Sequence, residues 1–436
     1  MSSGRRLPWR TLVPFALLTA GAAYALASWN WCGPWVEHAP TVLSRIRGEG
    51  PLRAGAAKVE LQPPFPVVVA GYPPPRAEAN VAEPPLHARA VVLETGGVRV
   101  GLVSLELLFI TPEVTERVRA RARESGVGEV LVMATHTHSS FGGYDTRLVA
   151  QVSGTGRYRS DAVESAVAGA SEAVARAAAS LTDVTLEVGK AEDAGLVYTR
   201  TGGQAPDGAL TRVVLRGASA PVAELLVFAA HPALIPRQRE RVDPDYPGRL
   251  SALRETASGG VTLLLQGAVG NASVAYSEGQ GVERAEGFAR ALSSLADRAE
   301  LVPAQGPVTL SLARMSAAMP RPDSTRLVPG FTRSAGDNVL CASAPREAEV
   351  DALRLGPLSL VTVPGEPTTG AGVELRERTG ATHVLALANG YVGYVDTPEL
   401  VRAHEGESMR QYFGAGLLER LNVAAQVAAD AAGFTR

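Results

Sequence analysis

Short apolar runs alternate with longer amphipathic segments along most of this chain. Apolar runs of about four to eight residues bounded by turn residues are typical of buried strands, whereas apolar positions recurring about every three to four residues are typical of helices. We expect strands at Ala56–Leu61, Arg89–Leu93, Val98–Phe109, Val130–Ala134, Val184–Gly189, Arg212–Arg216, Val222–Ala230, Val261–Gln266, Val308–Ala313, Leu358–Val363 and Val384–Ala388. We expect helices near Pro112–Glu124, Asp161–Leu181, Tyr246–Ala257, Glu283–Ala296, Gly370–Arg378 and Gly414–Ala432. The loose alternation predicts an α/β fold with a mixed β-sheet core and flanking helices.

Residues 1–35 are predicted to be a targeting segment. Arginines at positions 5, 6 and 10 precede an apolar stretch that runs from Leu12 to Ala27, and positive charge before an apolar core is the export orientation. Two alternatives fit this pattern. One is a signal peptide with a cleavage box at residues 25–27, and the other is an uncleaved membrane anchor, which is favoured by the tryptophans at its end, Trp29, Trp31 and Trp35. In both cases we expect the rest of the chain to lie outside the cytoplasm.

The remainder of the chain is predicted to form a single large domain. Residues 36–54 are expected to be a linker, and residues 55–436 show no internal boundary of composition. Residues 315–350 are expected to form an irregular insert within the domain. The predicted fold class is therefore α/β, with one large domain after an N-terminal hydrophobic segment.

Composition and charge exclude some classes of partner. The chain is 46% hydrophobic and 20% charged with a formal net charge of −2, so it lacks the basic footprint of a nucleic-acid-binding protein. Two cysteines, Cys32 and Cys341, are too few for a disulfide scaffold or a thiolate metal site. An exported protein could join them in one bridge, and two unpaired thiols are the alternative. The sequence does not determine the oligomeric state.

Two histidines follow the predicted strand Val130–Ala134. Side chains two residues apart on an extended segment project from the same face, so His136 and His138 are expected to point at one spot beyond the end of the strand. The chain has only seven histidines. Convergent imidazoles where a strand meets a Gly-rich loop are typical of metal or acid–base sites. A pair of loop histidines bonded to the backbone is the alternative.

Other strand ends also carry groups capable of chemistry. They are His231, the loop from Asn271 to Ser273, Glu366, and the segment Asn389–Tyr394. Loops at the carboxyl ends of strands are where α/β proteins bind ligands. Two histidines and a glutamate form the protein ligand set of many catalytic zinc sites, although spacing alone does not single out this combination.

Five ordered motifs resemble the catalytic domain of the neutral (non-lysosomal) ceramidases, amidases that cut the amide of N-acylsphingosine. Together they span most of residues 55–415. The motifs are Ala70-Gly-Tyr72, Thr135-His-Thr-His-Ser139 followed by Gly142-Gly-Tyr144, Phe228-Ala-Ala-His231, Val363-Pro-Gly-Glu366-Pro-Thr-Thr369, and Asn389-Gly-Tyr391-Val-Gly-Tyr394-Val-Asp-Thr397.

The resemblance implies a zinc site and its neighbours. The family's zinc ligands fall on His136, His231, Glu366 and Tyr394. His138 matches a histidine beside the metal that is not itself a ligand. Arg200, in Tyr198-Thr-Arg200, is similar to a substrate-facing arginine, with an ordinary loop arginine as the alternative.

Three further candidates lie where this chain departs from the family. Ser273 keeps the position of a serine regarded as nucleophile or proton acceptor, but the acidic residue two positions before it is Asn271 here. Because an amide cannot act as a base, we expect a metal-activated water, not Ser273, to be the nucleophile. His404 stands where the family has a tyrosine that helps to hold the reacting carbonyl, with an exposed histidine as the alternative. Because the sequence ends soon after the last motif, we expect the family's C-terminal β-sandwich domain to be absent.

The sequence therefore predicts a zinc-dependent hydrolase that cleaves the amide of an N-acyl lipid of the ceramide type, giving sphingosine and a fatty acid. The expected partners are this lipid or another N-acyl small molecule, and a membrane contacted through the N-terminal segment. One alternative is a zinc hydrolase of the same fold acting on another amide or ester. Another is a membrane-tethered binding protein without catalysis, which the Asn271 change would suit.

Overall fold

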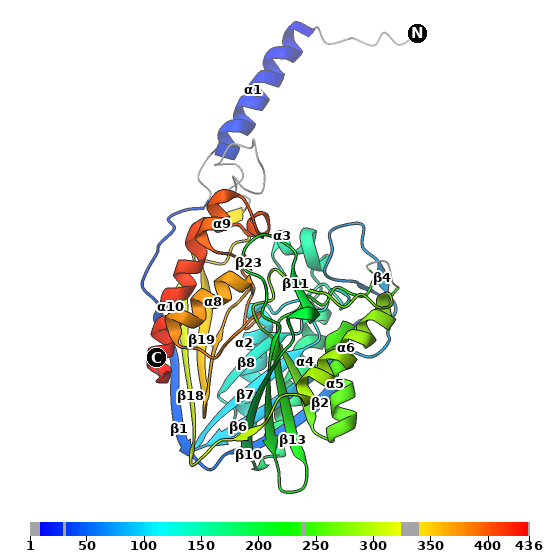
Figure 1. Cartoon of the computed structure of the whole chain (residues 1–436). Coiled ribbons are helices and arrows are strands. Elements are labelled where there is room, and N and C mark those ends of the chain that lie inside the picture. The colour runs from blue at the N-terminus through cyan, green and yellow to red at the C-terminus, as the bar shows by residue number, and fades with distance from the viewer. Residues whose placement is uncertain (1–8, 29–31, 237–239, 324–339, 435–436) are drawn as a thin grey trace.

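The computed structural model describes residues 9–28, 32–236, 240–323 and 340–434. Apart from helix α1 (Trp9–Ser28), these residues form a mixed α/β domain, as predicted. Its main framework is three five-stranded sheets with helices packed against them (Figure 1). Among the described residues, no helix has both the length and the apolar character needed to span a membrane.

The three sheets repeat one order of elements. Each has three successive antiparallel strands, a helix, a fourth strand parallel to the third, and a second helix. The first unit contains β2 (Arg53–Glu60), β6 (His87–Thr95), β7 (Val98–Leu105), α2 (Pro112–Ala122), β8 (Glu129–Ala134) and α4 (Ser160–Ala179). The second contains β10 (Thr185–Glu192), β12 (Ala209–Arg216), β13 (Pro221–Phe228), α5 (Asp245–Ser258), β15 (Val261–Gln266) and α6 (Gly281–Asp297). The third contains β18 (Val308–Ala318), β19 (Glu347–Leu355), β20 (Leu358–Thr362), α8 (Thr369–Thr379), β22 (His383–Leu385) and α10 (Leu417–Ala432).

An edge strand completes each sheet by pairing antiparallel with its first strand. The short strands β9 (Thr182–Asp183) and β17 (Val302–Pro303) pair with β2 and β10. Strand β1 (Thr41–Gly50) is longer and pairs with β18. The prediction of a linker over residues 36–54 is therefore wrong where β1 lies and where β2 begins. The expected irregular insert at 315–350 is likewise wrong at both ends, which belong to β18 and β19.

Each sheet buries both of its faces. Successive residues of a strand point to opposite faces, and in β6 Ala90 and Val92 pack under α4 whereas Val91 and Leu93 pack toward the other two sheets. The central cluster joins leucines and valines from all three sheets, including Leu102, Leu225 and Leu353. Burial on both faces explains why the strands read as continuous apolar runs.

Two helices begin at caps that fix the chain beside the strand ends. Thr111 precedes Pro112 of α2 and accepts a hydrogen bond from the Val114 amide, and Thr368 accepts one from the Ala371 amide at the start of α8. Such caps satisfy amides that the first helical turn leaves without partners. These caps fix the backbone path of the loops that follow β7 and β20.

The described cysteines form a disulfide. Cys32 and Cys341 are 309 residues apart in sequence and are bonded to each other, with Cα atoms 5.4 Å apart. This settles the alternative that the sequence left open. The bond joins the segment before β1 to the segment before β19.

Candidate functional site

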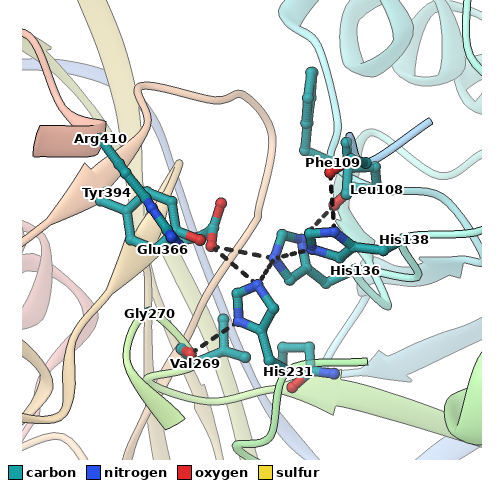
Figure 2. Close-up of polar contacts among 12 residues, drawn as sticks. Leu108, Phe109, His136, His138, His231, Val269, Gly270, Glu366, Tyr394 and Arg410 are labelled. Carbon is teal, nitrogen blue, oxygen red and sulfur yellow. Dashed lines mark hydrogen bonds and ion pairs between the residues drawn. The ribbon is translucent and has the colours of Figure 1, made fainter. Parts of the chain in front are cut away.

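The third and fourth strands of the three units deliver polar side chains to one place. His136 and His138 follow β8, His231 follows β13, and Glu366 follows β20. Figure 2 shows the three imidazoles and the carboxylate pointing toward one another. Tyr394, which opens β23 (Tyr394–Val395), lies beside Glu366 because β23 pairs with β21 (Glu366–Pro367).

Backbone carbonyls fix the orientation of all three imidazoles. Nδ1 lies 2.7 Å from the Leu108 oxygen in His136, 3.1 Å from the Gly71 oxygen in His138, and 3.4 Å from the Val269 oxygen in His231. A carbonyl oxygen can only accept a hydrogen bond, so Nδ1 carries the proton in each neutral ring. Each Nε2 atom therefore presents a lone pair.

These lone pairs face one another without a proton between them. Nε2 of His136 lies 3.2 Å from Nε2 of His231 and 3.4 Å from Nε2 of His138. The candidate ligand atoms of the three histidines lie within 4.8 Å of one another. Burial, and next the nearby His136, lower the pKa of His138 to about 3 and hold the pKa of His231 well below its usual value. Both rings are therefore neutral near pH 7.

The backbone around His136 and His138 is specialised. His136 has a positive φ of 70°, and its amide donates to the Leu107 oxygen. Gly71 has a φ of 104°, and a Cβ at this position would lie 2.8 Å from the backbone of His138. Only glycine fits such a backbone without strain, which explains the Gly in the Ala70-Gly-Tyr72 motif. The close approach allows the Gly71 carbonyl to orient the imidazole.

Glu366 supplies the negative charge of the cluster. One oxygen, Oε1, accepts a hydrogen bond of 2.5 Å from the Tyr391 hydroxyl. The other, Oε2, has no hydrogen-bond donor among the described residues and lies 3.1 Å from Nε2 of His136 and 3.9 Å from Nε2 of His231. Burial alone would raise the pKa of Glu366, but His136, Tyr391 and Tyr394 outweigh it and bring the pKa to about 2.

This donor set fits a divalent metal ion. Three imidazole lone pairs and a buried carboxylate oxygen without a donor converge, and a cation is the species that satisfies all of them at once. The hydrogen bonds at the three Nδ1 atoms fix the tautomers, as is usual for histidines that bind metals. The geometry brings together His136, His231 and Glu366 as predicted, and it offers His138 as a further nitrogen.

A buried carboxylate, Glu407, clamps two arginines around Tyr394. It binds Nε of Arg200 at 2.7 Å and Nη1 of Arg410 at 3.3 Å. The two guanidinium groups lie 5.6 and 5.7 Å from the centroid of the Tyr394 ring, and Nη2 of Arg200 donates to the Tyr394 hydroxyl at 2.8 Å. Arg200 also donates to the Gly270 oxygen. The substrate-facing arginine implied by the resemblance thus stands within the cluster.

The cluster lies in a cavity of about 640 Å³. Its described lining contains three arginines, one carboxylate and many apolar and aromatic side chains. Phe109 and Tyr391 form one wall as a stacked pair with centroids 4.2 Å apart. The volume suits a drug-sized or lipid-chain ligand, with its polar end at the histidines.

Neither Ser273 nor Asn271 belongs to the described lining of the cavity. Ser273 is the middle residue of β16 (Ala272–Val274), whose other two residues are buried, and it is not part of the described cavity lining. Asn271 is buried, and its Oδ1 accepts from the amide and the hydroxyl of Thr369 at the start of α8. Its amide nitrogen donates to Thr199. The structure thus gives Asn271 a capping role and supports no contact of either residue with a ligand in the cavity.

His404 lies outside the candidate site. His404 is exposed and caps the C-terminus of α9 (Pro398–Ala403) with a φ of 60°. It does not belong to the described cavity lining. The expectation that it holds the reacting carbonyl is therefore wrong, because the helix end directs this residue to solvent.

Tyr391, Glu407 and Arg410 belong to the site but were not predicted. Tyr391 belongs to a motif that the sequence analysis singled out, yet only Tyr394 was assigned from it. Glu407 lies three residues after His404, and only His404 was given a role in this segment. A buried carboxylate that organises arginines from distant segments leaves no local signal in one sequence.

Comparisons with known proteins agree with the resemblance. Residues 62–200 match the model of the family described as neutral/alkaline non-lysosomal ceramidase, N-terminal. Two solved structures share the fold. A ceramidase complexed with C2 matches with a TM-score of 0.75 at 19% sequence identity, covering 89% of this chain and 76% of that chain. The neutral ceramidase from Pseudomonas aeruginosa matches with a TM-score of 0.71 at 21% identity, covering 88% and 74%. No curated protein matches the chain significantly. The resemblance to the neutral/alkaline ceramidase family is confirmed.

Proposed function

We propose that this protein is a zinc-dependent amidohydrolase that cleaves the amide bond of a ceramide-like N-acyl lipid. One observation carries the proposal: three imidazoles and a carboxylate converge in a largely apolar cavity of about 640 Å³. The family match over residues 62–200 supports the same reaction class. We also retain the proposal that the domain acts outside the cytoplasm.

His136, His231 and Glu366 would hold the ion together with the Tyr394 oxygen. Zn²⁺ bound there would polarise a carbonyl and lower the pKa of water. Deprotonation of Tyr394 is opposed by burial and by Glu366, which raise its pKa well above the usual value, whereas Arg200 lowers it. The bond from Arg200 therefore favours the phenolate form that a metal ligand requires.

The remaining groups are placed to bind and orient the substrate. His138 carries its proton on Nδ1, so its Nε2 can accept a proton from attacking water but cannot donate to an oxyanion in this tautomer. Arg200 uses Nε and Nη2 in its described contacts, which leaves Nη1 to donate to the developing oxyanion. Hydrolysis breaks the C–N bond, and the departing amine takes up the proton.

A second candidate differs in the substrate. Arg200 and Arg410 share the single carboxylate Glu407, and the Arg410 side chain is 57% exposed. One positive charge at the cavity is therefore not balanced by Glu407. This favours an N-acyl compound with an anionic head group over a neutral ceramide.

A substrate panel tests the proposed function. We expect the purified protein to release fatty acid from a long-chain ceramide, to lose this activity to a zinc chelator and to regain it with Zn²⁺. Faster cleavage of an N-acyl amino acid of equal chain length would favour the second candidate. Full hydrolysis by metal-free protein would contradict both.

We predict that Ser273→Ala leaves hydrolysis largely intact. Ser273 does not line the cavity, so we expect kcat/KM to fall by less than about tenfold, equivalent to less than about 1.4 kcal/mol of transition-state stabilisation. Steady-state kinetics with zinc content measured on the same sample check this. Complete loss of activity with zinc retained would instead indicate that the serine is the nucleophile.

A further inference from the structure

The disulfide places the N-terminal helix next to the cavity. Helix α1 ends at Ser28, four residues before Cys32, and Cys32 is bonded to Cys341. Ser343, two residues further on, lines the cavity. A chain spans at most about 3.6 Å per residue, so α1 ends within about 14 Å of Cys32 and Ser343 lies within about 7 Å of Cys341. Figure 1 shows α1 projecting from the end of the molecule where α3 (Leu148–Ala150) and α9 lie.

Further contacts hold this connection to the domain. Arg346 donates to the backbone oxygens of Cys32 and Pro34, and its guanidinium lies 4.7 Å from the Trp35 ring centroid. The Trp35 indole donates to the Met319 oxygen. The segment from Cys32 to Trp35 is therefore attached to the domain at several points.

Apolar side chains are exposed both on α1 and at the cavity rim. On α1, Leu17 and Leu18 are 68% and 72% exposed. At the rim, Leu148 and Val152 are 62% and 59% exposed and Met409 is 47% exposed. Leu148 and Val152 flank Val149, Ala150 and Ser153, which line the cavity. Apolar groups clustered around a pocket entrance mark a surface that binds a partner.

We propose that this rim, formed by Leu148, Val152 and Met409, docks on a lipid bilayer, and that the Cys32–Cys341 bond holds it against the same bilayer that receives α1. A lipid surface covers the apolar side chains of α1 and of the rim at once. The disulfide links the segment that follows α1 to the segment that carries Ser343, which lines the cavity. The cavity then opens toward the bilayer, so an acyl chain passes from lipid to protein without crossing water.

Fluorescence labelling of the full chain tests the orientation. The described residues contain no free cysteine, so a single cysteine introduced as Val152→Cys can carry an environment-sensitive fluorophore. The matched control is Val302→Cys, because Val302 is similarly exposed, at 63%, and lies in β17, next to the start of β10. With phosphatidylcholine–phosphatidylglycerol vesicles, we expect a blue shift and quenching by a lipid-borne quencher at position 152 and neither at position 302.

A tether variant separates docking from anchoring. Replacing both natural cysteines with serine is expected to keep the protein on vesicles but to reduce the quenching at position 152. Equal quenching at the two positions, or none at 152, would overturn the proposal. A blue shift at 152 that depends on protein concentration without vesicles would show that a second copy covers the rim. The readout does not depend on hydrolysis, so it is independent of the proposed function.

Discussion

Replacing His136 with alanine is expected to remove bound zinc and hydrolysis together. His136 is the centre of the cluster, because its Nε2 is within 3.4 Å of both other imidazoles and of Glu366. We expect kcat/KM to fall by at least about a thousandfold, because removing one positioned group commonly costs about 10²–10³ and here the ion is lost as well. Metal content by mass spectrometry and hydrolysis should be measured on the same preparation.

Two further variants separate ligand loss from general damage. His38→Ala is a matched control, because His38 lies at the surface beside Glu347, and it should keep both zinc and activity. His138→Ala distinguishes the two possible ligand sets. It should keep zinc if His138 only accepts a proton, and lose zinc if this nitrogen is a ligand. Loss of activity in His136→Ala with full zinc content would contradict the assignment of His136 as a ligand.

Three of the four proposed ligands could be predicted because each one follows a strand. An apolar run that ends in His136, His231 or Glu366 can be recognised from the sequence alone. The family motifs then distinguish these residues from the other strand ends. The predicted strands and helices mostly match the structure for the same reason, since burial on both faces makes the strands continuously apolar. Catalytic groups at the ends of regular elements are the part of a site that a sequence shows best.

The arrangement that brings the strands together could not be predicted. The three units repeat one order of elements, but no repeat is visible in the sequence, because buried strands tolerate many apolar side chains of similar size. Strand β1 was missed because its residues are mostly exposed and its partner β18 lies about 270 residues away in the chain. Pairing at such a distance leaves no local pattern.

Polar residues whose role depends on distant partners could not be predicted from the sequence either. Glu407 matters because it binds arginines from two segments, and Asn271 because it caps a helix that begins almost a hundred residues later. His404 failed as a candidate for the opposite reason. Its motif suggested a role, but the end of α9 turns it toward solvent.

The second large effect is expected from Glu106→Ala, and it concerns stability. Glu106 is buried after β7, binds Arg89, and accepts a hydrogen bond of 2.7 Å from the His87 amide. Arg89 is only 3% exposed and also binds Glu255 on α5 at 2.7 Å. Removing one partner of a buried ion pair leaves an uncompensated charge and typically costs about 3–5 kcal/mol. We expect a loss near the lower end, about 3 kcal/mol, because Glu255 remains, and denaturant unfolding measures it.

The loss of stability caused by Glu106→Ala should depend on pH in a defined way. Burial alone would raise the pKa of Glu106, but Arg89 and His87 outweigh it and hold the pKa below its usual 4.5. A carboxyl group with a lowered folded-state pKa contributes stability above its unfolded pKa and loses it as the pH falls. The difference between wild type and Glu106→Ala should therefore be constant above about pH 5 and shrink in more acidic solution.

Two comparisons decide whether the buried charge is the cause. Glu172→Ala breaks the exposed pair with Arg176, with side chains 50% and 61% exposed, and should cost at most about 0.5 kcal/mol. The double variant Arg89→Leu/Glu106→Leu removes both charges and should recover most of the stability, because apolar residues often replace buried ion pairs without loss. A double variant no more stable than Glu106→Ala would show that the cost comes from elsewhere. The turn after Glu106 carries the carbonyls of Leu107 and Leu108 that hold His136, so zinc affinity should fall with stability in the single variant.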